Sequence, residues 1–136
     1  MEFSVFRRGV AEFVGTFTLI FIGGGAGIEV AVHGAGMGFG GGLVAVALAN
    51  GLAIGIMVSN LGHISGGHFN PAITLGFLAT RRIAPLLAVW YWVFQLAGGT
   101  VAALGLRWIF HQPAFGGAVP NVSTAVGFGS GRGLVV

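Results

Sequence analysis

The feature that most constrains this chain is a long stretch without charged side chains: residues 30–80 contain no Arg, Lys, Asp or Glu. Only 7% of all residues are charged and 55% are hydrophobic, whereas about a quarter of the residues in a soluble domain are charged. The chain has 136 residues, enough for one domain of ordinary size. We therefore expect a single membrane-embedded unit with several helical crossings, because a helix satisfies its backbone hydrogen bonds within lipid.

The few charged residues also exclude several functions. All the carboxylates (Glu2, Glu12 and Glu29) precede residue 30, and Cys is absent. Without paired carboxylates, a thiol or a nucleophile–base–acid set, we expect no enzymatic activity and no cofactor. His63 and His68 have no evident third ligand in the sequence, so no metal site is expected. The arginines are scattered and form no basic stripe, which argues against a nucleic-acid partner.

Three apolar runs are long enough to cross the hydrocarbon core of a bilayer, which takes about 20 apolar residues in a helix; the first is uncharged over residues 13–28 and includes Glu12 and Glu29 near its ends. We expect the first, second and third spans at about residues 10–30, 43–61 and 85–106. The glycine-rich residues 33–42 predict a loop between the first two spans. Beyond the third span, residues 111–131 predict an external loop and residues 132–136 the start of a fourth span.

The positions of the arginines predict the orientation of the spans. The Arg pairs at residues 7–8 and 81–82 lie on one side if the chain crosses three times, and Arg107 and Arg132 lie on the other. This excess of positive charge favours a cytoplasmic N-terminus. We expect an integral protein of the plasma (inner) membrane, with the lipid bilayer as its surroundings.

Residues 62–82, between the second and third spans, are too apolar for a surface loop and too few for another crossing. Asn70 is a favoured N-cap residue, and Pro71 is favoured at the first helical position. Together they predict a helix over residues 71–80, which is about half as long as the membrane is thick. Residues 65–69 are expected to be extended, and such backbone is tolerated at membrane depth only where protein buries it or where it lines water.

These features favour a re-entrant loop, in which the extended stretch enters the membrane and the half-helix returns. The amide of Asn70 and the carbonyls of the stretch would then face a file of neutral, hydrogen-bonding molecules, while the half-helix dipole would repel cations. The alternative is a capped helix in a cytoplasmic loop that lines nothing. The spacing of the residues alone does not decide between the two.

Three motifs occur in order along the chain: Ala11-Glu12-Phe13-Val-Gly15-Thr16-Phe17, Ser65-Gly-Gly-His68-Phe-Asn70-Pro71-Ala72-Ile-Thr74 and Tyr91-Trp-Val-Phe-Gln95-Leu-Ala-Gly98-Gly99. They resemble the motifs of the aquaporins and glycerol facilitators, the major intrinsic proteins. The resemblance implies an all-α membrane fold: one repeat of three transmembrane helices plus a re-entrant half-helix with an Asn-Pro-Ala box. It also implies a channel for the passive transport of water and small neutral solutes.

The resemblance further implies roles for individual residues. The pore box would be Asn70, Pro71 and Ala72, with Asn70 donating a hydrogen bond to the permeating molecule. Glu12 and Gln95 would support the loop from the first and third spans; for Gln95, a simple interhelical hydrogen bond is the alternative. The backbone carbonyls that line the cytoplasmic half of the pore would be those of Gly66, Gly67, His68 and Phe69.

Asn50 departs from the family pattern at a selectivity position, twenty residues before the box asparagine. Family members usually have Phe, Trp or His there. Asn is smaller and polar, so we expect a wider and more polar constriction that also passes small solutes such as ammonia, hydrogen peroxide, urea or glycerol. The alternative is that Asn50 makes an interhelical contact and does not face the lumen.

Length is the second departure. The family fold joins two inverted repeats around a site at the midplane, and this sequence contains one repeat and one Asn-Pro-Ala. We expect a truncated N-terminal half that does not conduct alone, whose partner is the missing C-terminal half, and a homotetramer for the full-length form. Two alternatives remain: a half-size subunit that pairs with another half, and a non-conducting packing subunit.

Overall fold

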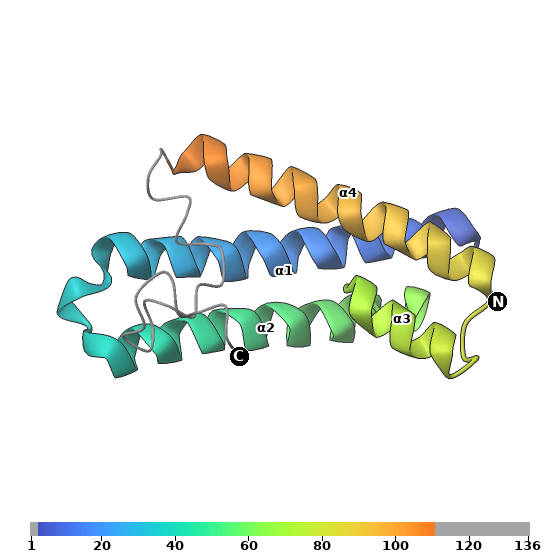
Figure 1. Ribbon diagram of the computed structural model, residues 1–136, viewed down its shortest axis with the longest axis horizontal. Helices are drawn as coiled ribbons and strands as arrows, with labels where there is room; N and C mark the ends of the chain where they lie inside the picture. Colours follow the sequence, from blue (N-terminus) through green and yellow to red (C-terminus); the bar gives the residue numbers. More distant parts are fainter. Residues whose placement is uncertain (1–2, 111–136) are drawn as a thin grey trace, which may run out of the picture.

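The computed structural model describes residues 3–110 and is all-helical over that range. Its elements are α1 (Val5–His33), the short 3-10 helix η1 (Gly34–Gly36), α2 (Gly38–Ser65), α3 (Pro71–Ala79) and α4 (Pro85–Ile109). Three long helices run along the long axis of the molecule, and the short α3 lies at one end (Figure 1). This arrangement confirms the predicted fold class; the loop and fourth span expected at residues 111–131 and 132–136 lie outside the described residues.

Local sequence signals set the starts of three helices. The hydroxyl of Ser4 accepts a hydrogen bond from the backbone N–H of Arg7 at 3.3 Å and caps α1. Pro71 and Pro85 occupy the first positions of α3 and α4, where the missing N–H of proline costs nothing. The predicted cap at Asn70 is confirmed, because its side-chain oxygen accepts from the backbone N–H of Ala72 at 2.8 Å.

The long helices extend beyond the ranges expected for their membrane-spanning parts. The largest difference is at residues 33–42: η1 and Met37 form the turn, and α2 already begins at Gly38. The prediction of a loop was therefore wrong for the second half of that range. A glycine costs only about 1 kcal/mol in a helix interior, whereas a backbone group without a partner in lipid costs several, so the helix persists through the glycines.

Helix α1 lies between α2 and α4 and contacts both of them closely (Figure 1). At Gly98 of α4, an added Cβ would overlap the carbonyl group of Phe13, so the two helices meet backbone to backbone. At Gly23 of α1, an added Cβ would overlap the side-chain amide of Asn50 from α2. Small residues permit such close approach, which drives helix association where no water is excluded.

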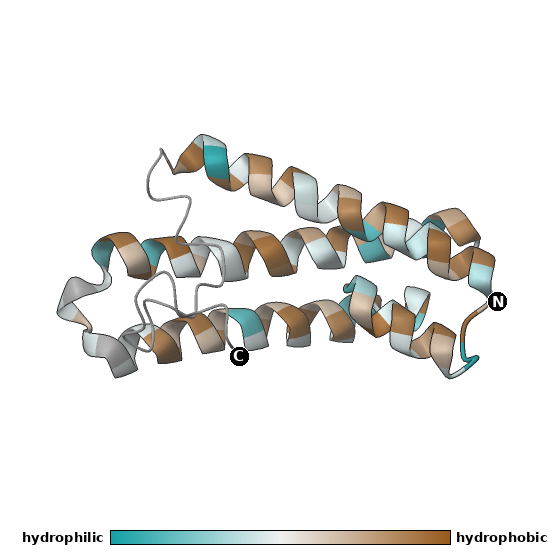
Figure 2. Cartoon of the chain, in the orientation of Figure 1, coloured by the Kyte–Doolittle hydropathy of each residue, from teal (hydrophilic) through white to brown (hydrophobic). Residues whose placement is uncertain are grey.

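Hydrophobic residues predominate along the three long helices, with a few hydrophilic positions between them (Figure 2). Leu52 of α2, Val93 and Leu96 of α4 are each more than half exposed. The three long helices are long and apolar enough to cross a membrane. Exposed side chains of this kind fit a lipid surrounding, since lipid tails are as apolar as leucine.

Candidate functional site

The segment between α2 and α3 reverses the direction of the chain within a few residues. Gly66, Gly67 and Phe69 have φ angles of 97°, 67° and 49°, so the prediction of an extended stretch was wrong. The reversal needs left-handed backbone, which glycine adopts without strain. At Phe69 the same conformation is unfavourable for an L-residue, and the burial of its ring, which is 1% exposed, holds it in place.

The reversed segment reaches almost to the middle of the long helices. The ring of Phe69 lies against Gly15, because an added Cβ there would overlap it. Counted from the first residue of each helix, Gly15 is the eleventh of 29 in α1 and Gln95 the eleventh of 25 in α4. At 1.5 Å per residue both lie about 15 Å from the helix start. Helix α3 then runs back toward that end of the bundle (Figure 1).

The loop is held by one carboxylate from α1. Glu12 is fully buried. Its Oε1 accepts from the Ser65 hydroxyl at 2.6 Å and from the His68 N–H at 3.0 Å. Its Oε2 accepts from the Phe69 N–H at 2.6 Å and from the Gln95 amide at 2.8 Å. Four donors thus replace the water that this carboxylate loses, and hydrogen bonds to an ionised acceptor are the strong kind.

A hydroxyl in α3 joins the loop to α4. Thr74 is fully buried, and its Oγ1 accepts from the Gln95 amide at 2.9 Å and donates to the Asn70 carbonyl at 3.2 Å. His68 Nδ1 lies 3.0 Å from the same Oγ1. The tautomer of His68 sets whether its ring donates to this hydroxyl or accepts from it.

The Asn-Pro-Ala residues lie at the start of α3. Asn70 is exposed and uses its side-chain oxygen for the cap, while its amide nitrogen has no hydrogen-bond partner within residues 3–110. The indole N–H of Trp92 donates to the Pro71 carbonyl at 3.0 Å, which fixes the helix start against α4. The carbonyls of residues 66–69 accept no hydrogen bond from the described part of the chain. The loop therefore offers one free amide donor and a row of free acceptors.

Nearer the end of the bundle, a second chain of polar contacts closes the site. The Tyr91 hydroxyl donates to the Ser65 carbonyl, and Arg8 Nε donates to the same hydroxyl at 2.9 Å. The guanidinium of Arg8 also lies 5.7 Å from the centre of the Tyr91 ring, within the range of a cation–π interaction. These contacts connect α1, the end of α2 and α4.

Sequence reasoning assigned no role in this site to Arg8, Ser65, Thr74 or Tyr91, although the last three lie within the quoted motifs. The available signal was the polar group itself, because a hydroxyl inside an apolar span needs a partner. Glu12 and Gln95 do meet at the loop. Gln95 Oε1 is buried without a partner among the described residues.

Asn50 lies away from this cluster. Its amide donates to the Val46 carbonyl within α2 at 2.9 Å, and its oxygen lies against Gly23 of α1. Asn50 is part-buried. Asn50 therefore makes an interhelical contact, which the sequence analysis gave as the alternative to a selectivity role.

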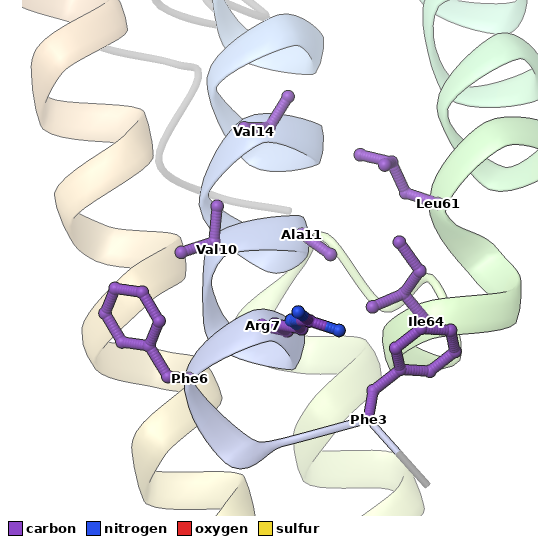
Figure 3. Close-up of a pocket in the computed structure, with 8 residues that line it drawn as sticks. All are labelled: Phe3, Phe6, Arg7, Val10, Ala11, Val14, Leu61 and Ile64. Carbon is purple, nitrogen blue, oxygen red and sulfur yellow. The ribbon is translucent and has the colours of Figure 1, made fainter. Parts of the chain in front are cut away.

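An apolar hollow of about 410 Å³ lies between α1 and α2 near the start of α1 (Figure 3). Its walls are apolar apart from one arginine: Phe3, Phe6, Arg7, Val10, Ala11, Val14, Leu61 and Ile64. The hydrogen-bonding groups of the loop do not line it, so it is distinct from the candidate site.

Comparison with known proteins identifies the family of this chain. The family model for the major intrinsic proteins matches residues 1–136, and the chain belongs to this family, as its motifs predicted. It is an integral membrane protein.

Curated relatives match at similar levels. A probable aquaporin TIP-type alpha from Phaseolus vulgaris is 41% identical over 124 residues, which cover 90% of this chain and 48% of the relative. Aquaporin TIP2-1 from Zea mays is 42% identical over 117 residues, or 85% of this chain and 45% of the relative. A probable aquaporin TIP-type RB7-18C from Nicotiana tabacum is 40% identical over 134 residues, or 93% and 50%. The chain spans about half the length of these relatives.

Proposed function

We propose that this chain forms one half of a passive transmembrane pore for water and small neutral solutes, with Asn70 at the pore centre. The observation that carries the proposal is the division of hydrogen-bonding groups in the loop. Glu12 takes the N–H groups of His68 and Phe69, which leaves the carbonyls of residues 66–69 as acceptors. The Asn70 oxygen caps α3, which leaves its amide as a donor.

This division suits a neutral permeant. Glu12 is the one carboxylate near the loop within the described part of the chain; it is buried and occupied by four donors, so it presents no charge to a passing ion. The start of α3 carries the positive end of a helix dipole, which opposes cations. A molecule that both donates and accepts, such as water, exchanges its hydrogen bonds for those of the loop.

We further propose that a second repeat completes the pore. A midplane site between two repeats is the general plan of such transporters, and the relatives are about twice as long as this chain. The proposed full-length assembly is a homotetramer, with the N-terminus in the cytoplasm and the plasma membrane as its location. No enzymatic step and no cofactor enter the proposed mechanism.

Osmotic swelling of proteoliposomes tests the proposal. The chain is reconstituted alone, and together with the C-terminal half of the maize relative. We expect the rate of protein-free liposomes for the chain alone and faster water flux for the pair. Fast flux from the chain alone would favour a half-size pore that pairs with itself, and no flux from either sample, with incorporation verified, would favour a packing subunit.

A matched pair of asparagine variants locates the pore. Asn70→Ala in the conducting pair is expected to reduce water flux, because the donor at the pore centre is lost. Asn60→Ala is the control, since Asn60 is exposed on α2 and donates to the Ile56 carbonyl, away from the loop. Equal flux from both variants would contradict the assignment of Asn70.

A further inference from the structure

The turn between α3 and α4 holds two arginines around an open hollow. Arg81 and Arg82 line a space of about 390 Å³ whose other walls are apolar: Leu78, Ile83, Ala84 and Pro85. The turn is hydrophilic, whereas α3 before it and the start of α4 after it are mostly hydrophobic (Figure 2). A space with cationic and apolar walls fits an occupant that is anionic at one end and apolar at the other.

The arginine side chains are not needed to finish α3. The backbone N–H of Arg82 donates to the Phe77 carbonyl at 2.8 Å, and the N–H of Arg81 donates to the Leu78 carbonyl at 3.0 Å. These two bonds form a Schellman motif, which satisfies the last carbonyls of the helix. Arg81 has φ 57° at the position where this motif usually has glycine. An arginine thus occupies a position where the backbone alone favours glycine.

The described chain supplies no anion for this pair. Within residues 3–110, neither arginine forms an ion pair. Glu12 is buried in the loop cluster, and Glu29 pairs with His33 at 3.0 Å near the other end of α1. The sequence contains no carboxylate side chain after Glu29. Glu2 lies outside the described residues; among residues 3–110, no carboxylate pairs with Arg81 or Arg82, which leaves their charges open to an external anion.

We propose that this hollow binds the phosphate-bearing head group of an anionic phospholipid in the adjacent leaflet. The hollow lies at the start of α4, one of the three candidate membrane spans, where lipid head groups are found. Guanidinium groups match phosphate oxygens in a two-pronged geometry, and basic pockets between transmembrane helices bind acidic head groups. The apolar walls contact the first methylenes of the acyl chains. This inference does not depend on the proposed pore.

Native mass spectrometry of the detergent-solubilised chain tests the site. The chain is titrated with phosphatidylglycerol and, separately, with zwitterionic phosphatidylcholine, and we expect the first retained lipid to be phosphatidylglycerol. The variant combines Arg81→Asn with Arg82→Gln, since Asn tolerates the left-handed backbone. From the contribution typical of an arginine beside anionic lipid, we expect the two arginines together to raise the affinity for phosphatidylglycerol about 30-fold. The double variant should lose this factor, and its affinity for phosphatidylcholine should change little.

Controls separate this site from general attraction to anionic lipid. Arg7→Gln removes an exposed arginine near the start of α1, and Arg107→Gln removes one near the end of α4; both should keep the preference. Arg81→Lys with Arg82→Lys should keep most of it, and circular dichroism verifies folding. The proposal is overturned if all neutral variants lose affinity alike, if the double variant keeps it, or if millimolar inorganic phosphate displaces the lipid.

Discussion

The backbone N–H of Phe69 donates to Glu12 Oε2 at 2.6 Å, a contact between residues 57 positions apart in the sequence. On the other side, the Phe69 ring lies against Gly15, one turn further along α1. Phe69 is thus positioned from α1 by one polar and one apolar contact. The location of Asn70, the next residue, depends on both.

Glu12→Gln should destabilise the loop. Each oxygen of Glu12 accepts two hydrogen bonds, and the glutamine replaces one of these oxygens by an NH₂ group. Whichever oxygen is replaced, at least one buried donor loses its acceptor. A lost bond to a charged acceptor costs about 1.5–3 kcal/mol. Chemical unfolding in detergent measures the loss, and hydrogen exchange at the His68 and Phe69 amides should become faster.

Glu29→Gln serves as the control for this change. Glu29 is exposed, and its one ion pair among residues 3–110 is with His33 on the same helix; exposed pairs contribute about 0–1 kcal/mol. If both variants unfold alike and exchange at the loop amides is unchanged, Glu12 does not hold the loop.

Gly15→Ala should displace Phe69. The added methyl group overlaps a ring that is 1% exposed and cannot rotate into free space, and overpacking of this kind costs about 1–3 kcal/mol. Gly51→Ala is the matched control, because a Cβ there meets nothing within 4 Å; alanine should stabilise α2 by up to about 1 kcal/mol. Thermal unfolding compares the two. A stable Gly15→Ala variant would contradict the described packing.

Tyr91→Phe should weaken the contact between α4 and the end of α2. The Ser65 carbonyl loses its donor and Arg8 loses its acceptor, at a cost of about 1–3 kcal/mol for the group left without a partner. Trp90→Phe removes the exposed bond to the Val5 carbonyl and should cost less. Unfolding by denaturant measures the stability that each variant loses. A larger loss for Trp90→Phe than for Tyr91→Phe would contradict the role given to Tyr91.

The sequence predicts the start of α3 because capping is local: Asn70 and Pro71 act within one turn, and no distant residue is needed to recognise them. The path before α3 is a different matter. Phe69 adopts left-handed backbone because Gly15 and Glu12, both on α1, receive its ring and its N–H. Nothing within residues 65–69 contains that information, and an extended stretch was the natural expectation.

The partners of the loop show the same division. Glu12 stands out in a sequence as a carboxylate in an apolar span, so its importance could be predicted. Thr74 and Tyr91 carry no charge that would single them out in an apolar span, and their roles depend on how α3 and α4 are brought together. The glycine-rich residues 38–42 were expected to form a loop, and they are helical. In lipid, a helix is favoured even through glycines, because it satisfies the backbone hydrogen bonds.

Asn50→Phe tests the predicted selectivity role in the conducting pair. If Asn50 lines a constriction, the larger ring narrows it, and urea or glycerol flux should fall more than water flux. Light-scattering measurements of both fluxes on the same vesicles give the ratio. Equal effects on the two fluxes would contradict a selectivity role and agree with the contact between Asn50 and Gly23.

The depth of α3 in the bilayer tests the central claim most directly. The chain has no native cysteine, so a fluorophore can be attached at Ile73→Cys, in the first turn of α3, or at Thr80→Cys, its C-cap; both positions are exposed. Nitroxide lipids labelled in the acyl chain or in the head group then report depth. A re-entrant helix places the two positions about 10 Å apart in depth: position 73 should be quenched best by the acyl-chain nitroxide and position 80 by the head-group nitroxide. Equal quenching of both positions by the head-group nitroxide would show that α3 lies outside the membrane, which contradicts the account.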